Sequence, residues 1–160
     1  MTIEVIDNFL GQRHFDEIRE VLSGLTIPWY YNDSVTGDIV TNQYYFTHNF
    51  YNYNRWMSEH HIIMKPIIEM LGVKAIMRIK GNLYPGVETP VEDPMHIDYP
   101  FEHKAAILYI NTNNGYTVFE DGTKVEPVAN RLVKFNGFVP HASSRCTDAK
   151  VRLNINFNYF

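Results

Sequence analysis

The chain has a single cysteine, Cys146, so it cannot form a disulfide within itself. Free thiols are typical of reducing compartments, which favours an intracellular protein. The chain also has no excess of basic residues, because 14 Lys and Arg stand against 18 Asp and Glu, for a formal net charge of −4. Binding to nucleic acid requires a basic surface, so we expect no nucleic-acid partner.

Long apolar runs are missing as well. The apolar stretches are far shorter than the roughly 20 residues of a membrane-spanning helix, so we expect no membrane partner. Residues 1–7 contain neither a positively charged region nor a long apolar run. We therefore expect no signal peptide and a cytoplasmic location. No sequence pattern indicates the oligomeric state.

What the chain does contain is a globular composition rich in aromatic residues. It has 160 residues, 45% of them hydrophobic and 20% charged, which is typical of one folded domain. Its 11 Tyr and 10 Phe favour β-strands. We expect a single domain over 1–160, with a helical support region at 1–72 and a β-rich core at 73–160.

The N-terminal half predicts two helices. Apolar residues at helical spacing indicate one helix over 12–25 and a second over 52–71, in which Pro66 should kink or split the helix. A short strand is expected at 3–6 and another within the aromatic segment, at 39–48.

After Gly72 the pattern changes to the alternation that is typical of strands. Asp121-Gly122 is a hairpin signal between two of these strands. Two helices followed by seven or eight short strands predict a mainly β, α+β fold built as a sandwich or barrel. The expected strands cover 75–84, 105–110, 116–120, 123–125, 131–135 and Val151–Tyr159.

His96-Ile97-Asp98, together with His141, is the strongest candidate metal site. In an extended segment His96 and Asp98 point to the same side, about 7 Å apart along the backbone. Two imidazoles and one carboxylate suit Fe(II) and similar divalent ions, and they leave coordination positions open. The alternative is a surface loop with a hydrogen-bonded histidine.

Arg152 is the candidate anion-binding residue. It begins a polar stripe of alternating residues, which continues with Asn154, Asn156 and Asn158. In a sheet with one face packed on the core and the other in solvent, this stripe would be exposed, and Arg152 would be a surface charge. In a barrel with an internal pocket it would line the pocket, and the guanidinium would bind a carboxylate. Lys150 is the second candidate, whereas Arg145 is expected in a polar loop.

The order of these motifs along the chain resembles that of the Fe(II)- and 2-oxoglutarate-dependent dioxygenases, in particular the small prolyl-4-hydroxylase-like branch. The resemblance covers most of the chain. The matching segments are 6–10, followed by a helix, then 82–86, 96–98, 106–111, 115–119, 127–135, 140–141 and Arg152.

The resemblance implies a double-stranded β-helix, or jelly roll, with two N-terminal helices packed on the larger sheet. It implies that the two histidines and the aspartate of the motif bind Fe(II) and that Arg152 binds the distal carboxylate of 2-oxoglutarate. Tyr84 would donate its hydroxyl to 2-oxoglutarate, and Tyr109 would flank the same pocket. Asn154 is added to the cosubstrate-binding residues on geometry alone. The alternative for both tyrosines is core packing. O₂ would be the oxidant, with ascorbate as a reductant.

The implied reaction is hydroxylation of a C–H bond in a small molecule, peptide or protein, with release of succinate and CO₂. Because Asp98 fills the carboxylate position, halogenation is disfavoured. No substrate-binding motif is recognisable, so prolyl residues, free amino acids and nucleobases stay open, in falling order. The acidic loop 87–94 (Glu88, Glu92, Asp93) and the segment 29–31 (Trp29, Tyr30, Tyr31) either border a substrate mouth or are solvated surface.

Two other kinds of protein remain compatible with these patterns. One is a non-catalytic jelly-roll binding module, and the other is a cupin-like metalloenzyme that does not use 2-oxoglutarate. Only the dioxygenase hypothesis requires Arg152 to point inward.

Overall fold

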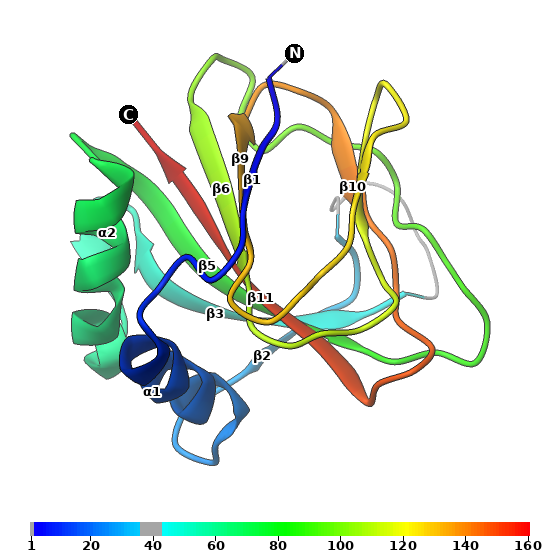
Figure 1. Ribbon diagram of the computed structural model, residues 1–160, viewed down its shortest axis with the longest axis horizontal. Helices are drawn as coiled ribbons and strands as arrows, with labels where there is room; N and C mark the ends of the chain where they lie inside the picture. Colours follow the sequence, from blue (N-terminus) through cyan, green and yellow to red (C-terminus); the bar gives the residue numbers. More distant parts are fainter. Residues whose placement is uncertain (1, 36–42) are drawn as a thin grey trace.

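The structure, a computed structural model, describes residues 2–35 and 43–160. Over these described residues it is a mainly β, α+β fold with two antiparallel sheets (Figure 1). The eight-stranded sheet has the order β1-β9-β6-β11-β5-β3-β2, with β4 paired to β3, and the three-stranded sheet has the order β10-β7-β8. The strands are β1 (Glu4–Ile6), β2 (Tyr30–Asn32), β3 (Tyr45–Asn52), β4 (Arg55–Trp56), β5 (Ile76–Pro85), β6 (Lys104–Tyr109), β7 (Thr117–Phe119), β8 (Lys124–Val125), β9 (Leu132–Asn136), β10 (His141–Ser143) and β11 (Val151–Tyr159).

Two α-helices, α1 (Gln12–Ser23) and α2 (Lys65–Leu71), pack on the large sheet. Figure 1 shows both on the same side of β5 and β11. Phe15, Ile18 and Leu22 of α1 are buried in one core with Ile155 and Phe157 of β11, because the helical spacing puts all three on one face. The expected packing of two helices on the larger sheet is confirmed, although α1 ends two residues before Leu25.

The helix predicted for 52–71 is wrong in its first half. Tyr53 and Asn54 have positive φ angles of 51° and 59°, and they turn β3 into β4. A 3₁₀ helix, η1 (Glu59–Met64), then follows the cap formed by Ser58. Pro66 lies in the first turn of α2, where its missing N–H costs nothing, so it begins a helix there. The apolar spacing did not reveal this tight turn.

The strands of the C-terminal half were predicted well. β5 and β11 pair antiparallel, with Arg152 opposite Tyr84, and Asn156 opposite Lys80. The Asp121-Gly122 turn joins β7 to β8, as expected, with Gly122 at a φ of 84°. For the strand predicted at 39–48, residues 39–42 lie outside the described residues, and β3 begins at Tyr45. The region 1–72 is more than a helical support, because β1 to β4 join the large sheet.

Both faces of β11 are buried. Leu153, Ile155 and Phe157 face the core under the helices, and the polar stripe that begins at Arg152 faces the opposite way, toward the small sheet. A strand covered on both sides can present polar residues to an internal site, so the alternative of a solvent-exposed stripe is excluded.

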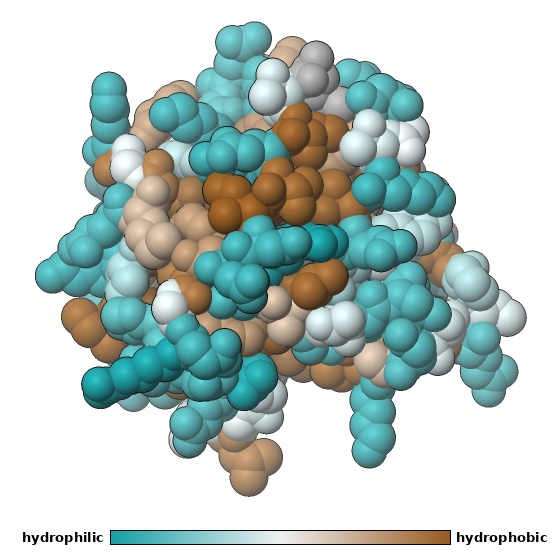
Figure 2. All heavy atoms as spheres, in the orientation of Figure 1, coloured by the Kyte–Doolittle hydropathy of each residue, from teal (hydrophilic) through white to brown (hydrophobic). Residues whose placement is uncertain are grey.

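The face of the molecule seen in Figure 2 is largely polar. Figure 2 shows hydrophilic side chains projecting around a smaller hydrophobic area on one face of the molecule. Within the described ranges, no helix is both long and apolar enough to cross a membrane.

Candidate functional site

His96, Asp98 and His141 come together in space. Their potential ligand atoms all lie within 4.8 Å of one another. The backbone explains the meeting, because His96 and His141 form an antiparallel bridge in which His96 N donates to His141 O at 3.0 Å and His141 N donates to His96 O at 2.9 Å. His141 is the first residue of β10, while His96 and Asp98 belong to the segment after β5. The three side chains can therefore reach a single ion.

Both histidines are oriented by backbone carbonyls. The Nδ1 atom of His96 lies 3.2 Å from Pro94 O, and that of His141 lies 2.9 Å from Val139 O. A carbonyl partner fixes the proton on Nδ1 and leaves Nε2 free for a metal. Burial, followed by the neighbouring His141, lowers the pKa of His96. The neutral imidazole that a metal requires is therefore favoured.

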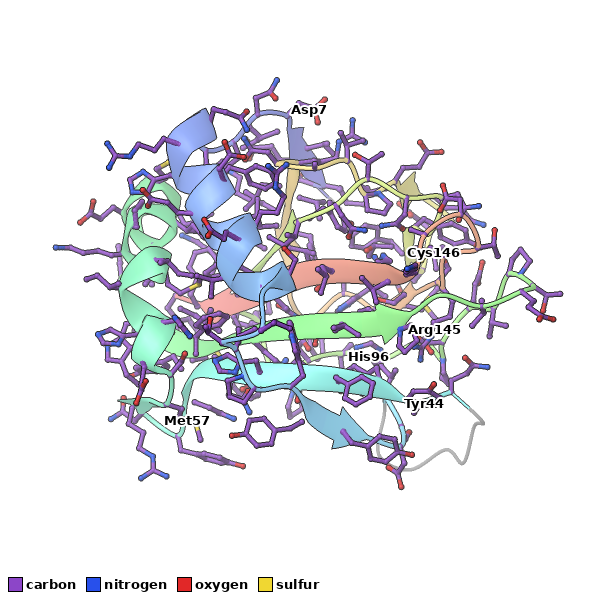
Figure 3. The ribbon with its side chains drawn as sticks, turned by 90° about the horizontal axis from the view of Figure 1, so that it is seen from below. Asp7, Tyr44, Met57, His96, Arg145 and Cys146 are labelled. Carbon is purple, nitrogen blue, oxygen red and sulfur yellow. The ribbon has the colours of Figure 1, made fainter. Side chains whose placement is uncertain are left out.

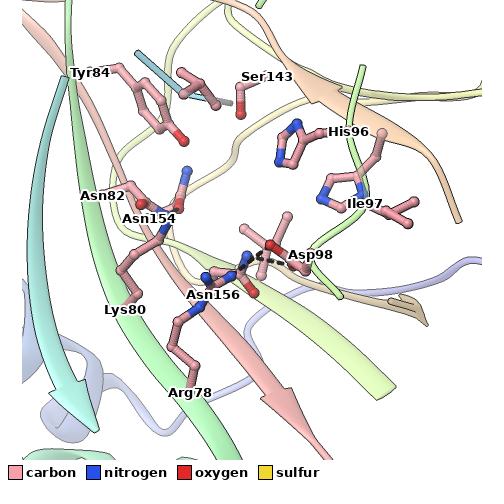
Figure 4. A pocket seen from close by; sticks show the side chains of 13 residues that line it. Arg78, Lys80, Asn82, Tyr84, His96, Ile97, Asp98, Ser143, Asn154 and Asn156 are labelled. Atoms are coloured by element: carbon pink, nitrogen blue, oxygen red, sulfur yellow. Dashed lines mark hydrogen bonds and ion pairs between the residues drawn. The ribbon is translucent and has the colours of Figure 1, made fainter. Parts of the chain in front are cut away.

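The Asp98 carboxylate is held on both oxygens. Arg78 Nη2 donates to Oδ1 at 2.6 Å, and Asn156 donates to Oδ2 at 3.1 Å (Figure 4). Asn158 also donates to Oδ2, at 2.8 Å. Burial opposes ionisation of Asp98, but Arg78 and these amide hydrogen bonds more than offset it. They hold the pKa of the carboxyl well below its usual range, so Asp98 is an anion.

Arg152 is fully buried, which excludes the surface alternative. Its Nη2 donates to Thr117 Oγ1 at 3.1 Å, but Nε and Nη1 have no hydrogen-bond partner among the described residues. Its guanidinium carbon lies 5.4 Å from the ring centroid of Tyr84 and 5.7 Å from that of Tyr109. A buried guanidinium with unused donors has the chemistry to bind an anion.

A cavity of about 230 Å³ lies between the two sheets beside the metal-ligand candidates. Tyr84 and Asn154 line it. Arg152 is not among the described lining residues, but its guanidinium lies beside the ring of Tyr84. Tyr109 is also fully buried and donates its hydroxyl to Thr117 Oγ1 at 2.8 Å. The lining residues are Val35, Arg78, Lys80, Asn82, Tyr84, His96, Ile97, Asp98, Ile107, His141, Ser143, Asn154 and Asn156.

Sequence reasoning missed Arg78 and Lys80 as site residues. Both lie on β5, whose alternation also directs Asn82 and Tyr84 into the cavity (Figure 4). This is the same signal that identified the polar stripe of β11, and it would have found them.

A buried ion pair corrects two further expectations. Arg145, expected in a polar loop, and Asp93, expected near a substrate mouth or in solvent, have side chains only 1% and 0% exposed and lie 3.0 Å apart. Arg145 also donates to Tyr44 O at 2.8 Å. Figure 3 shows Arg145 and Tyr44 near each other. The pair ties the segment before His96 to the segment after β10, and so supports the metal-ligand candidates.

The remaining residues proposed for a substrate mouth do not line the cavity in the described part of the chain. Glu88, Glu92, Tyr30 and Tyr31 are exposed, and Trp29 packs against the core. Glu92 instead binds the Tyr116 hydroxyl and Lys124. Lys150, the second anion-binding candidate, is exposed.

Comparison with known proteins identifies the fold. No family model and no curated protein sequence matches the chain. Solved structures do match over nearly its whole length. A 2OG-Fe(II) oxygenase family oxidoreductase from Burkholderia pseudomallei gives a TM-score of 0.74 at 12% identity, covering 98% of this chain and 84% of the other.

Two prolyl hydroxylases are also similar. The enzyme from Trichoplax adhaerens, solved with a peptide fragment of hypoxia inducible factor, gives a TM-score of 0.68 at 17% identity, covering 99% of this chain and 83% of its own. A prolyl-4-hydroxylase from Pseudomonas putida gives 0.64 at 17% identity, covering 98% and 91%. The chain thus has the fold of the 2OG-Fe(II) oxygenases, prolyl-4-hydroxylases included, and its two antiparallel sheets are consistent with their double-stranded β-helix.

Proposed function

We propose that this protein is an Fe(II)- and 2-oxoglutarate-dependent dioxygenase with a jelly-roll core. It hydroxylates a C–H bond of an organic substrate and releases succinate and CO₂. One observation carries the proposal: a His-Asp-His donor group within 4.8 Å stands near a buried arginine whose Nε and Nη1 have no partner in the described chain. A metal ion would bind to the His-Asp-His donors, and the carboxylate of a cosubstrate would accept hydrogen bonds from the arginine.

In this proposal His96, Asp98 and His141 hold the iron, and Arg152 binds the distal carboxylate of 2-oxoglutarate. The bound iron and 2-oxoglutarate supply the O₂-dependent oxidation, as cofactors generally supply the difficult chemistry. Tyr84, Tyr109 and Asn154 shape the cosubstrate pocket. Ascorbate is added as a reductant in assays.

The chain's own contribution is to orient the metal-ligand side chains. Arg78 and the amides of Asn156 and Asn158 fix the carboxylate of Asp98. The carbonyls of Pro94 and Val139 fix the two imidazoles. Such outer contacts set the direction from which each ligand approaches the metal.

A peptide is the first substrate class to test. Two of the similar structures are prolyl hydroxylases, and the one from Trichoplax adhaerens was solved with a peptide. Prolyl peptides should therefore be assayed for hydroxyproline, with succinate measured in parallel.

The deciding experiment is anaerobic titration of the protein with Fe(II) and 2-oxoglutarate, followed by visible spectroscopy. The wild type should show the weak charge-transfer band of the chelate. Arg152→Ala should weaken 2-oxoglutarate binding roughly tenfold or more, because a charged hydrogen-bond partner is lost. Arg13→Ala, on the exposed face of α1, is the matched control.

Each failure has a distinct meaning. No band in the wild type refutes the proposed function. Metal binding without 2-oxoglutarate binding supports the cupin-like alternative, and binding of neither supports the non-catalytic module. A band that Arg152→Ala leaves unchanged removes Arg152 from its proposed role. Asp98→Ala should abolish succinate formation, and retained turnover would contradict the ligand assignment.

A further inference from the structure

β5 forms one wall of the cavity, and this wall carries two positively charged side chains, Arg78 and Lys80. Alternation along the strand places Arg78, Lys80, Asn82 and Tyr84 on one face, and all four line the cavity (Figure 4). Two cations on one internal wall are unusual, because each must be compensated when it is removed from water.

Arg78 is compensated within the protein. It donates from Nη2 to Asp98 Oδ1 at 2.6 Å and from Nε to Asn158 Oδ1 at 3.2 Å. Its guanidinium carbon also lies 5.3 Å from the ring centroid of Tyr99. The positive charge of Arg78 is therefore paired with Asp98, and its side chain is oriented by Asp98, Asn158 and Tyr99.

Lys80 is not compensated. Within the described residues it makes no hydrogen bond or ion pair, and its Nζ lies 5.7 Å from the ring centroid of Tyr45. Among the described lining residues Asp98 is the only acid, and its carboxylate is bound by Arg78, Asn156 and Asn158 and not by Lys80. Burial, and then the charge of Arg78, lowers the pKa of Lys80 to about 8, so the ammonium form still predominates at neutral pH.

Lys80 is also distinct from the proposed cosubstrate anchor. Arg152 lies on β11, is fully buried, and contacts Thr117 of the small sheet. Lys80 lies on β5, opposite Asn156 in the strand register, and is only partly buried. The site therefore offers two cations to two different anions.

We propose that Lys80 binds a carboxylate of the substrate, so that the enzyme selects organic substrates carrying a carboxylate near the C–H bond that is oxidised. This inference rests on the proposed function and narrows its substrate class. A carboxylate at Lys80 would supply the missing partner of the ammonium group, whereas a neutral substrate would leave that charge without a partner.

The test uses propionate and its neutral isostere propionamide as probes. The protein is loaded with Mn(II) and with N-oxalylglycine, an unreactive analogue that fills the 2-oxoglutarate position. Mn(II) broadens the NMR signal of a probe methyl group that binds close by. We expect propionate to be broadened by the wild type and by Lys80→Arg, and propionamide to be broadened far less.

Lys80→Gln should weaken propionate binding roughly tenfold or more, while Mn(II) and N-oxalylglycine still bind. Lys150→Gln removes an exposed lysine and serves as the matched control. Equal broadening of propionate in Lys80→Gln and wild type would overturn the inference, since the anion would then bind elsewhere. So would equal broadening of both probes, or no broadening of propionate by the loaded wild type. If Mn(II) or N-oxalylglycine fails to bind the wild type, the proposed function itself fails.

Discussion

Arg78 and Asp98 form an ion pair at 2.6 Å, with side chains 17% and 5% exposed. Arg78 lies within β5, whereas Asp98 lies in the segment that follows it. The carboxylate proposed to bind the metal is therefore oriented by the large sheet rather than by its own segment. Nε of the same arginine contacts Asn158 of β11, which also donates to Asp98. The position of one metal-ligand candidate thus depends on two strands.

We predict that Arg78→Ala weakens Mn(II) binding by about 10- to 100-fold, the usual effect of removing a partner that orients a metal ligand. Arg78→Lys keeps the charge but loses the planar fork, and should give an intermediate loss. Calorimetric titration of Mn(II) measures both, and circular dichroism confirms that each variant folds. Wild-type affinity in Arg78→Ala would show that Asp98 is oriented without the arginine.

Gly115 leaves room for Arg152. A Cβ atom at this position would lie 3.0 Å from Arg152 Cδ and 2.9 Å from Asn113 Oδ1. Gly115→Ala should therefore displace the arginine and weaken 2-oxoglutarate binding by roughly tenfold, with Mn(II) affinity unchanged. Gly11→Ala, where a Cβ would meet nothing within 4 Å, is the control. Unchanged 2-oxoglutarate affinity would mean that Arg152 tolerates the shift or does not bind the cosubstrate.

The buried pair Asp93–Arg145 should matter strongly for stability. Removing one member leaves the other charge buried without its partner, which costs about 3–5 kcal/mol. We expect Arg145→Met to lower the free energy of unfolding by that amount in urea denaturation. Asp93→Asn should do likewise, and the double variant should lose less than the sum of the two. Strict additivity would show that the two side chains do not stabilise each other.

His48 should make stability fall in mild acid. Its Nδ1 lies 2.8 Å from Pro28 O and its Nε2 lies 2.8 Å from Ser58 Oγ, and burial lowers the pKa of the imidazole. Below the unfolded-state pKa of about 6.5, the unfolded chain binds the proton more readily than the folded one, so stability decreases as pH falls. His48→Gln should reduce this pH dependence, measured on metal-free protein.

The matched control is His14→Gln, because His14 is exposed on α1. It should leave the pH dependence of unfolding as it is in the wild type. If His48→Gln retains the full wild-type slope between pH 7.5 and 5.5 (a range chosen to bracket the usual imidazole pKa), another group accounts for it.

Local patterns predicted the C-terminal half well and the segment 52–71 poorly. Alternation over Val151–Tyr159 spans a whole strand, so its period of two is unambiguous. The range predicted as one helix, 52–71, includes the last residue of β3 and the hairpin that joins β3 to β4. The positive φ angles of Tyr53 and Asn54 decide that turn, and neither residue is a strong turn signal of the Gly or Pro kind.

The sequence by itself determined the donor chemistry of the candidate site and the polar stripe that begins at Arg152, because residue type and period are local properties of the chain. Only the tertiary structure decided which polar groups meet. The antiparallel bridge between His96 and His141, the hold of Arg78 on Asp98, and the burial of Arg145 against Asp93 all join distant segments. Such pairings follow from strand order and register, which are set by packing of the whole chain and not by any local pattern.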